Sequence, residues 1–179
     1  NTGSGFQDGR VQSRSFVLAH SCQKAVRARG ADTDLIDLRD YQLPLHTGNG
    51  DCKTPDVLAL NERLQAANGV VGATPIYVYD TNAAVKNFVD LTGRAWSDKP
   101  VGFLCAAGGH ASYMSILGLA NSLMLDFRCL IVPRFVYATG DDFANDRQPD
   151  MTIESKEIKE RIGQLADALL HLADALRTT

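Results

Sequence analysis

The chain has 179 residues, of which 45% are hydrophobic and 22% are charged, a composition typical of a soluble globular protein. The formal net charge of −3 gives no reason to expect a nucleic-acid groove or an anionic membrane surface as a partner. No apolar stretch is long enough to span a bilayer, and no signal-peptide pattern opens the chain. We therefore expect one domain over residues 1–179.

The four cysteines lack the spacing of a metal site or a redox motif, because none forms a C-x-x-C pair. Cys105 and Cys129 lie in apolar runs, which predicts buried thiols, and Cys22 falls on the apolar face of a helix. Only Cys52 is expected to be exposed. Free thiols of this kind are typical of a reducing compartment, so we expect a cytoplasmic protein.

The first predicted element is a helix over 13–29, which Gly30 ends. Polar and apolar residues alternate over 33–38, which predicts an edge strand. Thr54 and Pro55 then supply the cap and the first position of a second helix, because proline is well tolerated there.

The rest of the chain alternates strand and helix. The predicted elements are a strand over 70–73, a helix over 82–92, a strand over 101–106, a helix over 112–127, a strand over 130–137 and a helix over 155–176. The strands at 70–73 and 101–106 are continuously apolar, which predicts central parallel strands covered on both faces. Pro133 predicts that its strand lies at an edge or carries a bulge, because proline cannot donate to a ladder. The helix over 112–127 is apolar nearly all round, so it is either wholly buried or covered by a partner subunit.

Strand–helix alternation predicts a three-layer α/β/α fold with a parallel sheet. Such a sheet needs a strand before the glycine- and serine-containing segment 2–4, and only Asn1 stands there. We expect that the natural chain begins earlier, because an empty position in the middle of the sheet would leave backbone groups of two neighbouring strands unpaired.

Three loops follow predicted strand ends, and in an open α/β sheet such loops converge on a ligand-binding crevice. The first loop runs into the helix at 13–29, whose N-terminus can bind an anion. Ser4, Ser13 and Ser15 offer hydroxyls to a phosphate, and Arg10 or Arg14 adds charge. The loop has neither a P-loop lysine nor the third glycine of the dinucleotide fingerprint. The alternative is a polar surface loop in which Ser13 only caps the helix.

The second loop follows the strand at 70–73. The backbone of Thr74, Pro75 and Ile76 can face a planar heterocycle, and Tyr77 or Tyr79 can flank it. The alternative is an ordinary β-to-α turn in which the proline ends the strand.

The third loop contains Gly108 and Gly109, which allow a ligand to approach the backbone closely, followed by His110. The alternative is a glycine turn with a surface histidine. The chain offers no Ser/His/Asp set, metal spacing or carboxylate pair for hydrolysis, so we assign no catalytic side chain. We expect a cofactor to supply the chemistry.

In their order, these segments resemble the NADPH-dependent FMN reductase family, which is flavodoxin-like in fold. The matching features are a Gly-Ser loop that ends Ser-x-Ser, a Thr-Pro-x-Tyr loop, a helix in which lysine and aspartate are four residues apart, and a Gly-Gly loop, at 3–15, 74–77, 85–90 and 108–109. The Thr-Pro-Ile-Tyr form and the stretch 107–114 look most similar to flavin reductases that serve alkanesulfonate monooxygenases. The Pro-Glu-Tyr-Asn motif common in related azo, quinone and chromate reductases is absent.

The resemblance implies hydride transfer from NADPH to FMN, and onward transfer to a quinone, dye, metal ion or partner monooxygenase. It also implies a homodimer or homotetramer. By position, the FMN phosphate would be held by Ser4, Arg10, Ser13 and Ser15. The isoalloxazine would be bordered on one side by Thr74, Pro75, Ile76 and Tyr77, and on the other by Gly108, Gly109 and His110.

Two further classes of function stay open at this point. One is a flavodoxin-like electron-transfer or flavin-carrier protein that does not itself oxidise NADPH, although flavodoxins are usually far more acidic than −3. The other is a receiver-like α/β domain without flavin, which needs an acidic cluster where Gly3 and Ser4 stand.

Overall fold

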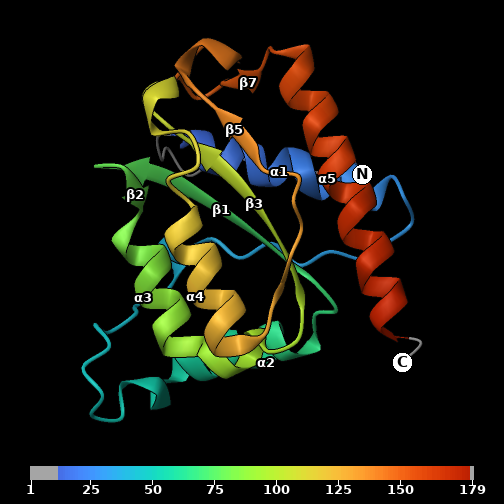
Figure 1. Cartoon of the computed structure of the whole chain (residues 1–179). Coiled ribbons are helices and arrows are strands. Elements are labelled where there is room, and N and C mark those ends of the chain that lie inside the picture. The colour runs from blue at the N-terminus through green and yellow to red at the C-terminus, as the bar shows by residue number, and fades with distance from the viewer. Residues whose placement is uncertain (1–11, 178–179) are drawn as a thin grey trace, which may run out of the picture.

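The computed structural model describes residues 12–177, and a mainly parallel sheet forms its central layer (Figure 1). The third strand in the chain pairs with the first on one side and with the fourth and fifth on the other, and the second strand is antiparallel to the end of the first. These strands are β1 (Val70–Tyr77), β2 (Asp80–Thr81), β3 (Pro100–Ala106), β4 (Leu130–Ile131) and β5 (Val136–Ala138).

Helices cover both faces of the sheet, which confirms the three-layer prediction (Figure 1). One face carries α1 (Arg14–Arg27) and α5 (Lys156–Arg177), and the other carries α2 (Pro55–Ala66), α3 (Ala83–Thr92) and α4 (Leu117–Phe127). The described residues also form short 3₁₀ turns and a small hairpin: Leu38–Asp40, Asp51–Lys53, Gly93–Trp96, His110–Ser112, Gly140–Asp142, β6 (Phe143–Ala144) and β7 (Thr152–Ile153). Within residues 12–177, no helix is long and apolar enough to cross a membrane.

The strand β3 is the centre of the core, and all seven of its residues are buried. Successive side chains of a strand point to opposite faces. Phe103 and Cys105 therefore pack beneath α2, α3 and α4, while Leu104 and Ala106 pack beneath α1 and α5. The prediction of a buried strand at 101–106 is confirmed.

The predicted helices are present, with local shifts at their ends. Pro55 is the first residue of α2, and Asn82 caps α3 by accepting a hydrogen bond from the Ala84 N–H at 2.8 Å. The helix α4 begins at Leu117 rather than at 112, because Met114 adopts a left-handed φ of 70° that no α-helix accommodates.

Pro133 interrupts the predicted strand over 130–137, which is divided into β4 and β5. Both pieces pair only with β3 within the described part of the chain, so the predicted edge position is confirmed.

The prediction of an edge strand over 33–38 is wrong. The backbone there is extended at Asp37, but no strand in residues 12–177 pairs with it. Side chains hold the segment instead: Arg27 donates to the Thr33 hydroxyl at 2.6 Å, and Arg63 donates to the carbonyl of Leu35 at 3.2 Å. The prediction that 70–73 is covered on both faces is confirmed, because Val70 packs on the α2, α3 and α4 side and Val71 and Ala73 pack on the α1 and α5 side. Its predicted central position in the sheet is not observed within the described residues. These residues are half-buried, because within the described residues β1 has β3 along one edge and only the short β2 elsewhere.

Candidate functional site

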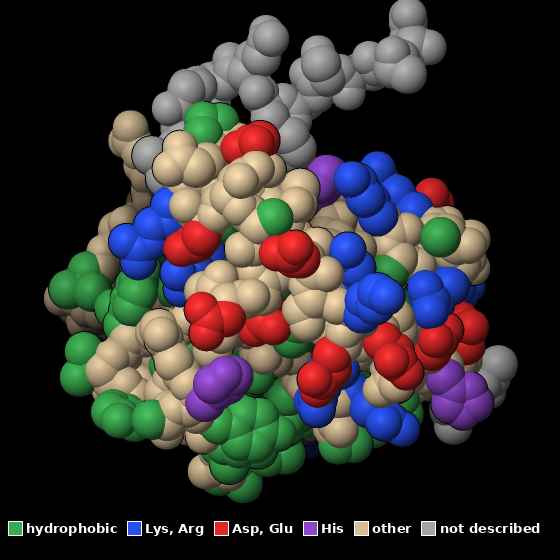
Figure 2. Space-filling model, turned by 90° about the horizontal axis from the view of Figure 1, so that it is seen from above, with side chains coloured by type: hydrophobic (Ala, Val, Ile, Leu, Met, Phe, Trp, Pro, Cys, Tyr) green, Lys and Arg blue, Asp and Glu red, His purple; other side chains and the backbone are tan. Residues whose placement is uncertain are grey.

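Four segments meet at the carboxyl-terminal edge of the sheet, which Figure 2 views from above. Ala107 follows β3, and its N–H donates to the carbonyl of Ala138 at the end of β5 at 2.9 Å. Arg14, in the first turn of α1, donates from Nη1 to the Ala107 carbonyl at 3.1 Å. Pro75, near the end of β1, lies opposite Ala106 at the end of β3. The start of α1 and the ends of β1, β3 and β5 therefore share this edge of the sheet, here called the crevice edge because open α/β sheets bind ligands outside the carboxyl ends of their strands.

Arg14 connects the start of α1 to the loop after β3 and to Asp146. Its Nε and Nη2 donate to the two carboxylate oxygens of Asp146 at 2.7 and 2.6 Å, an arrangement typical of strong ion pairs. The hydrogen bond to Asp146 is the main cause of the raised pKa of Arg14, and the same bond lowers the pKa of Asp146. The guanidinium also lies against Gly140, where a side chain would place its Cβ 2.7 Å from Nη2. Arg14 is thus committed to protein partners rather than presented to a ligand.

Ser13 and Ser15 lie at the N-terminus of α1. The Ser13 hydroxyl accepts a hydrogen bond from the Phe16 N–H at 3.2 Å, so it caps the helix. Its Oγ is 3.3 Å from Oγ of Ser15. Capping uses Ser13 as an acceptor, and the hydrogen bond between the two hydroxyls uses the proton of one of them, so the other hydroxyl can still donate to an anion. Ser4 and Arg10, the other predicted phosphate ligands, lie outside the described residues.

The segment after 70–73 differs from the predicted β-to-α turn. Pro75 does not end the strand: it lies in β1 opposite Ala106, and β1 continues to Tyr77. The side chains of Thr74 and Ile76 are buried, and the Thr74 hydroxyl is 2.9 Å from that of Thr81 in β2. Of the residues predicted to border a flavin here, Pro75 is half-buried and Tyr77 is exposed.

A two-residue loop of Val78 and Tyr79 joins β1 to β2, with φ angles of 52° and 59°. Hairpin loops with two positive φ values normally contain asparagine and glycine, because a β-branched residue is strained in this region. Val78 is 95% exposed, so no packing within the described residues explains its presence. Backbone strain of this kind is concentrated at functional sites, and the loop presents Tyr77, Val78 and Tyr79 outward together.

The loop after β3 leaves room for a ligand. No atom of the described residues lies within 4 Å of where a Cβ would be at Gly108 or Gly109, and His110 is exposed. The next residues are anchored, because Ser112 hydrogen-bonds to the Tyr137 hydroxyl and the Tyr113 ring meets that of Tyr137 edge-on at 5.5 Å.

The crevice edge fits FMN on three observations. Its glycine backbone is uncovered, and two hydroxyls lie at a helix N-terminus. The exposed Tyr77 and Tyr79 lie at and just after the end of β1, the strand that pairs with β3. When bound, FMN supplies the redox chemistry that the side chains lack. The part of the protein is to hold the phosphate, border the ring and exclude water.

Sequence reasoning missed Asp146, Tyr137 and the strained loop of Val78 and Tyr79. Asp146 is 132 residues from Arg14, and no local pattern marks such a pair. Tyr137 lies in an apolar strand, a context that predicts a buried core side chain rather than a residue of the site. An Asn-Gly pair would have indicated the hairpin, and none is present at 78–79.

Comparison with known proteins identifies the family and the fold. A model of the family described as NADPH-dependent FMN reductase matches residues 9–144. An NADPH azoreductase of Bacillus sp. (strain OY1-2) is 29% identical over 133 residues, which are 70% of this chain and 75% of the relative. The flavoenzyme NAD(P)H:(acceptor) oxidoreductase FerB from Paracoccus denitrificans has a TM-score of 0.73 at 19% identity, covering 93% of this chain and 92% of that chain. A WrbA-like flavodoxin from Agrobacterium tumefaciens has a TM-score of 0.60 at 16% identity, covering 92% and 90%.

The sheet and the helices on its two faces define a flavodoxin-like α/β fold. The chain belongs to the NADPH-dependent FMN reductase family, because the family model matches most of its length. It is an oxidoreductase that uses FMN and NAD(P)H.

Proposed function

We propose that this crevice holds FMN and that NADPH is the preferred reductant. In this arrangement Ser13 and Ser15, together with Ser4 and Arg10, hold the phosphate. The segment 74–77 borders one side of the ring, and the loop of Gly108, Gly109 and His110 borders the other. The support is the geometry at the strand ends, where Arg14 of α1 donates to the Ala107 carbonyl after β3 and Pro75 of β1 pairs with Ala106.

The uncovered backbone of the glycine loop is the observation that carries this proposal. The N–H groups of Gly108 and Gly109 have no acceptor within residues 12–177. Such donors stabilise negative charge that develops on a ring during reduction. Side chains at both positions would fill the space that the ring requires.

Gly109→Val tests the site directly. The φ of Gly109 is −173°, which any residue adopts, and its surroundings are open, so stability is expected to stay unchanged. The valine methyls would occupy the ring's position, so FMN affinity is expected to fall by about a hundredfold or more, since one clash removes several close contacts. Gly163→Ala, on α5 and away from the crevice, is the matched control and should bind FMN normally. Unchanged FMN affinity in folded Gly109→Val would contradict the site.

We also propose that the protein is a homo-oligomer that uses the exposed face of α4. Leu117, Met124 and Leu125 are spaced to share one side of the helix, and Leu125 is 77% exposed. Figure 2 shows hydrophobic side chains gathered along one margin of the molecule. A contiguous apolar surface of this kind is typical of an interface. Leu125→Asp is expected to halve the mass measured by light scattering, and a monomeric native protein would exclude the interface.

The onward acceptor is proposed to be a small oxidant or a partner monooxygenase, reached at the exposed side of Tyr77 and His110. The four described cysteines are free, which supports a cytoplasmic location. A stopped-flow experiment that mixes photoreduced protein with a quinone, an azo dye or oxygen would rank the acceptors.

A further inference from the structure

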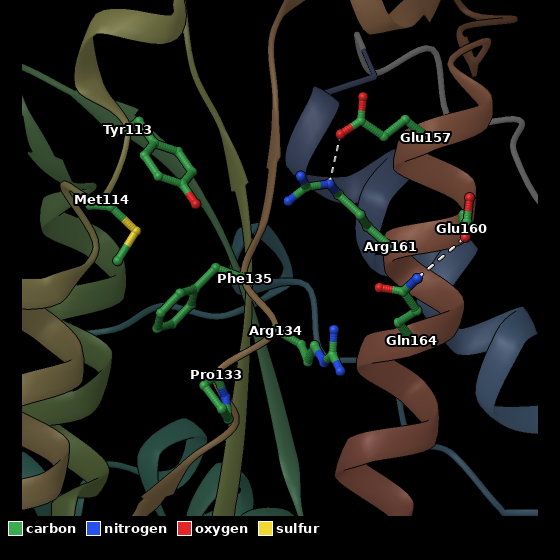
Figure 3. A pocket seen from close by; sticks show the side chains of 9 residues that line it. All are labelled: Tyr113, Met114, Pro133, Arg134, Phe135, Glu157, Glu160, Arg161 and Gln164. Carbon is green, nitrogen blue, oxygen red and sulfur yellow. Dashed lines mark hydrogen bonds and ion pairs between the residues drawn. The ribbon is translucent and has the colours of Figure 1, made fainter.

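A groove of about 550 Å³ opens along the sheet edge between β4–β5 and α5 (Figure 3). Its floor is the irregular segment between the two short strands, which contains Pro133, Arg134 and Phe135. One side carries Tyr113 and Met114, and the other is the first half of α5. The volume is in the range of pockets that bind small ligands.

The aromatic side of the groove is held in place from within. The Phe135 ring stacks on Phe103 of the core, with ring centres 6.0 Å apart and planes at 27°. Tyr113 is exposed on one side and meets Tyr137 edge-on on the other. Rings anchored in this way need no reordering to stack on a planar heterocycle, which makes them a preformed surface for a base.

Two guanidinium groups lie across the edge segment 133–135 from these rings. Figure 3 shows Arg134 and Arg161 extending into the space between the segment 133–135 and α5, with Tyr113 and the Phe135 ring on the other side of that segment. Arg134 is exposed, and no acidic group in residues 12–177 pairs with it. Among residues 12–177, Arg161 donates only from Nε, to Glu157 at 2.9 Å, so none of these residues occupies its terminal nitrogens.

The carboxylates of the groove, Glu157 and Glu160, leave the terminal nitrogens of both arginines unpaired among the described residues. Glu157 is the partner of Arg161, and Glu160 accepts a hydrogen bond from Gln164 at 3.3 Å and lies along the helix rather than in the gap (Figure 3). Terminal guanidinium nitrogens bind phosphate oxygens in pairs, with a planar geometry that lysine cannot provide.

The groove adjoins the crevice edge through Tyr113, which follows His110 by three residues. Three residues of chain span at most about 10 Å. A long ligand that reacts near His110 therefore has the groove within reach along η4 (His110–Ser112).

We propose that the groove binds the adenosine 2′-phosphate part of NADPH, with the adenine on Tyr113 and Phe135 and the 2′-phosphate on Arg134 and Arg161. This inference rests on the proposed function. It assigns the discrimination between NADPH and NADH, which differ only in that phosphate, to the sheet edge rather than to the flavin loops.

Adenosine 2′,5′-bisphosphate is the probe for this subsite. Isothermal titration of FMN-saturated protein should give one site per chain, and Arg134→Gln should weaken it by about tenfold or more, the usual effect of losing a charged hydrogen-bond donor. Tyr113→Ala should weaken it by about tenfold through lost stacking. Arg94→Gln is the matched control, because Arg94 is also an exposed arginine but lies in η3 (Gly93–Trp96), which packs among α2, α3 and α4. AMP, which lacks the 2′-phosphate, should bind the native protein more weakly and should not distinguish Arg134→Gln from it.

Kinetics add an independent readout. Arg134→Gln should raise KM for NADPH about tenfold and leave kcat and the KM for NADH unchanged, because it removes binding that is equal in the ground and transition states. Equal affinity of native protein and Arg134→Gln for the bisphosphate, or its displacement by FMN in native protein, would overturn the subsite. If the protein oxidises neither nucleotide, the proposed function fails on its own, and the titration still decides whether the groove binds the probe.

Discussion

Arg14 is expected to act by positioning the loop after β3 rather than by binding FMN. Arg14→Ala removes two charge-assisted hydrogen bonds to Asp146 and one to the Ala107 carbonyl. The arginine and aspartate side chains are 18% and 31% exposed, so solvent screens the pair in part. We expect the free energy of unfolding to fall by about 1–2 kcal/mol. The loop then loses its tie to α1, and FMN affinity should fall about tenfold, a cost of about 1.4 kcal/mol.

Asp146→Ala separates this role from direct phosphate binding. Removing the aspartate frees the guanidinium of Arg14, which would strengthen FMN binding if Arg14 were a phosphate ligand. If Arg14 only positions the loop, Asp146→Ala should weaken FMN binding in the same direction as Arg14→Ala, and the double variant should be little worse than either. Quenching of FMN fluorescence gives the affinities, and urea titration gives the stabilities. Tighter FMN binding in Asp146→Ala would refute the reasoning.

Three further outcomes are expected. Gly102→Val should destabilise the fold by about 2 kcal/mol in urea titration, because its Cβ would lie 2.6 Å from Leu165 in a fully packed core; a neutral effect would contradict this packing. Arg14 lowers the pKa of Asp146, so the pair stabilises the fold above the ordinary aspartate pKa of 3.8 and loses that contribution as the pH falls below it. Asp146→Asn should therefore make the free energy of unfolding depend less on pH between about pH 5 and 3. An unchanged pH dependence would exclude the pair as its source. Burial raises the pKa of Cys22 to about 11 and that of Cys105 to about 12, so iodoacetamide at pH 8 should modify half-buried Cys52 first, as mass mapping would show; early labelling of Cys105 would contradict its burial.

The sequence predicts the parts of the fold that depend on local patterns. The run at 101–106 gives the buried strand β3, the apolar stripe through Ile158, Ile162 and Leu165 gives α5, and Pro133 marks the interrupted edge strand. The segment at 33–38 has a strand's alternation, but a strand also needs a partner, and sequence periodicity cannot supply one.

In the candidate site, too, the sequence predicts the features that depend on local residues and misses those that depend on the tertiary fold. Gly108 and Gly109 are recognisable because glycine in a loop after a strand allows close approach. The tie between Arg14 and Asp146 joins residues that only the tertiary fold brings together. Val78 has a positive φ, whereas β-branched residues strongly prefer a negative φ, so local propensity predicts an extended backbone at this position.

An anaerobic titration of the FMN-loaded protein with NADPH tests the central claim most directly. The account predicts that the visible absorbance of the flavin is lost rapidly and stoichiometrically, and that NADH acts more weakly. If FMN binds but NADPH does not bleach it, the reductase function is contradicted, and the alternative of an electron-carrier protein is favoured.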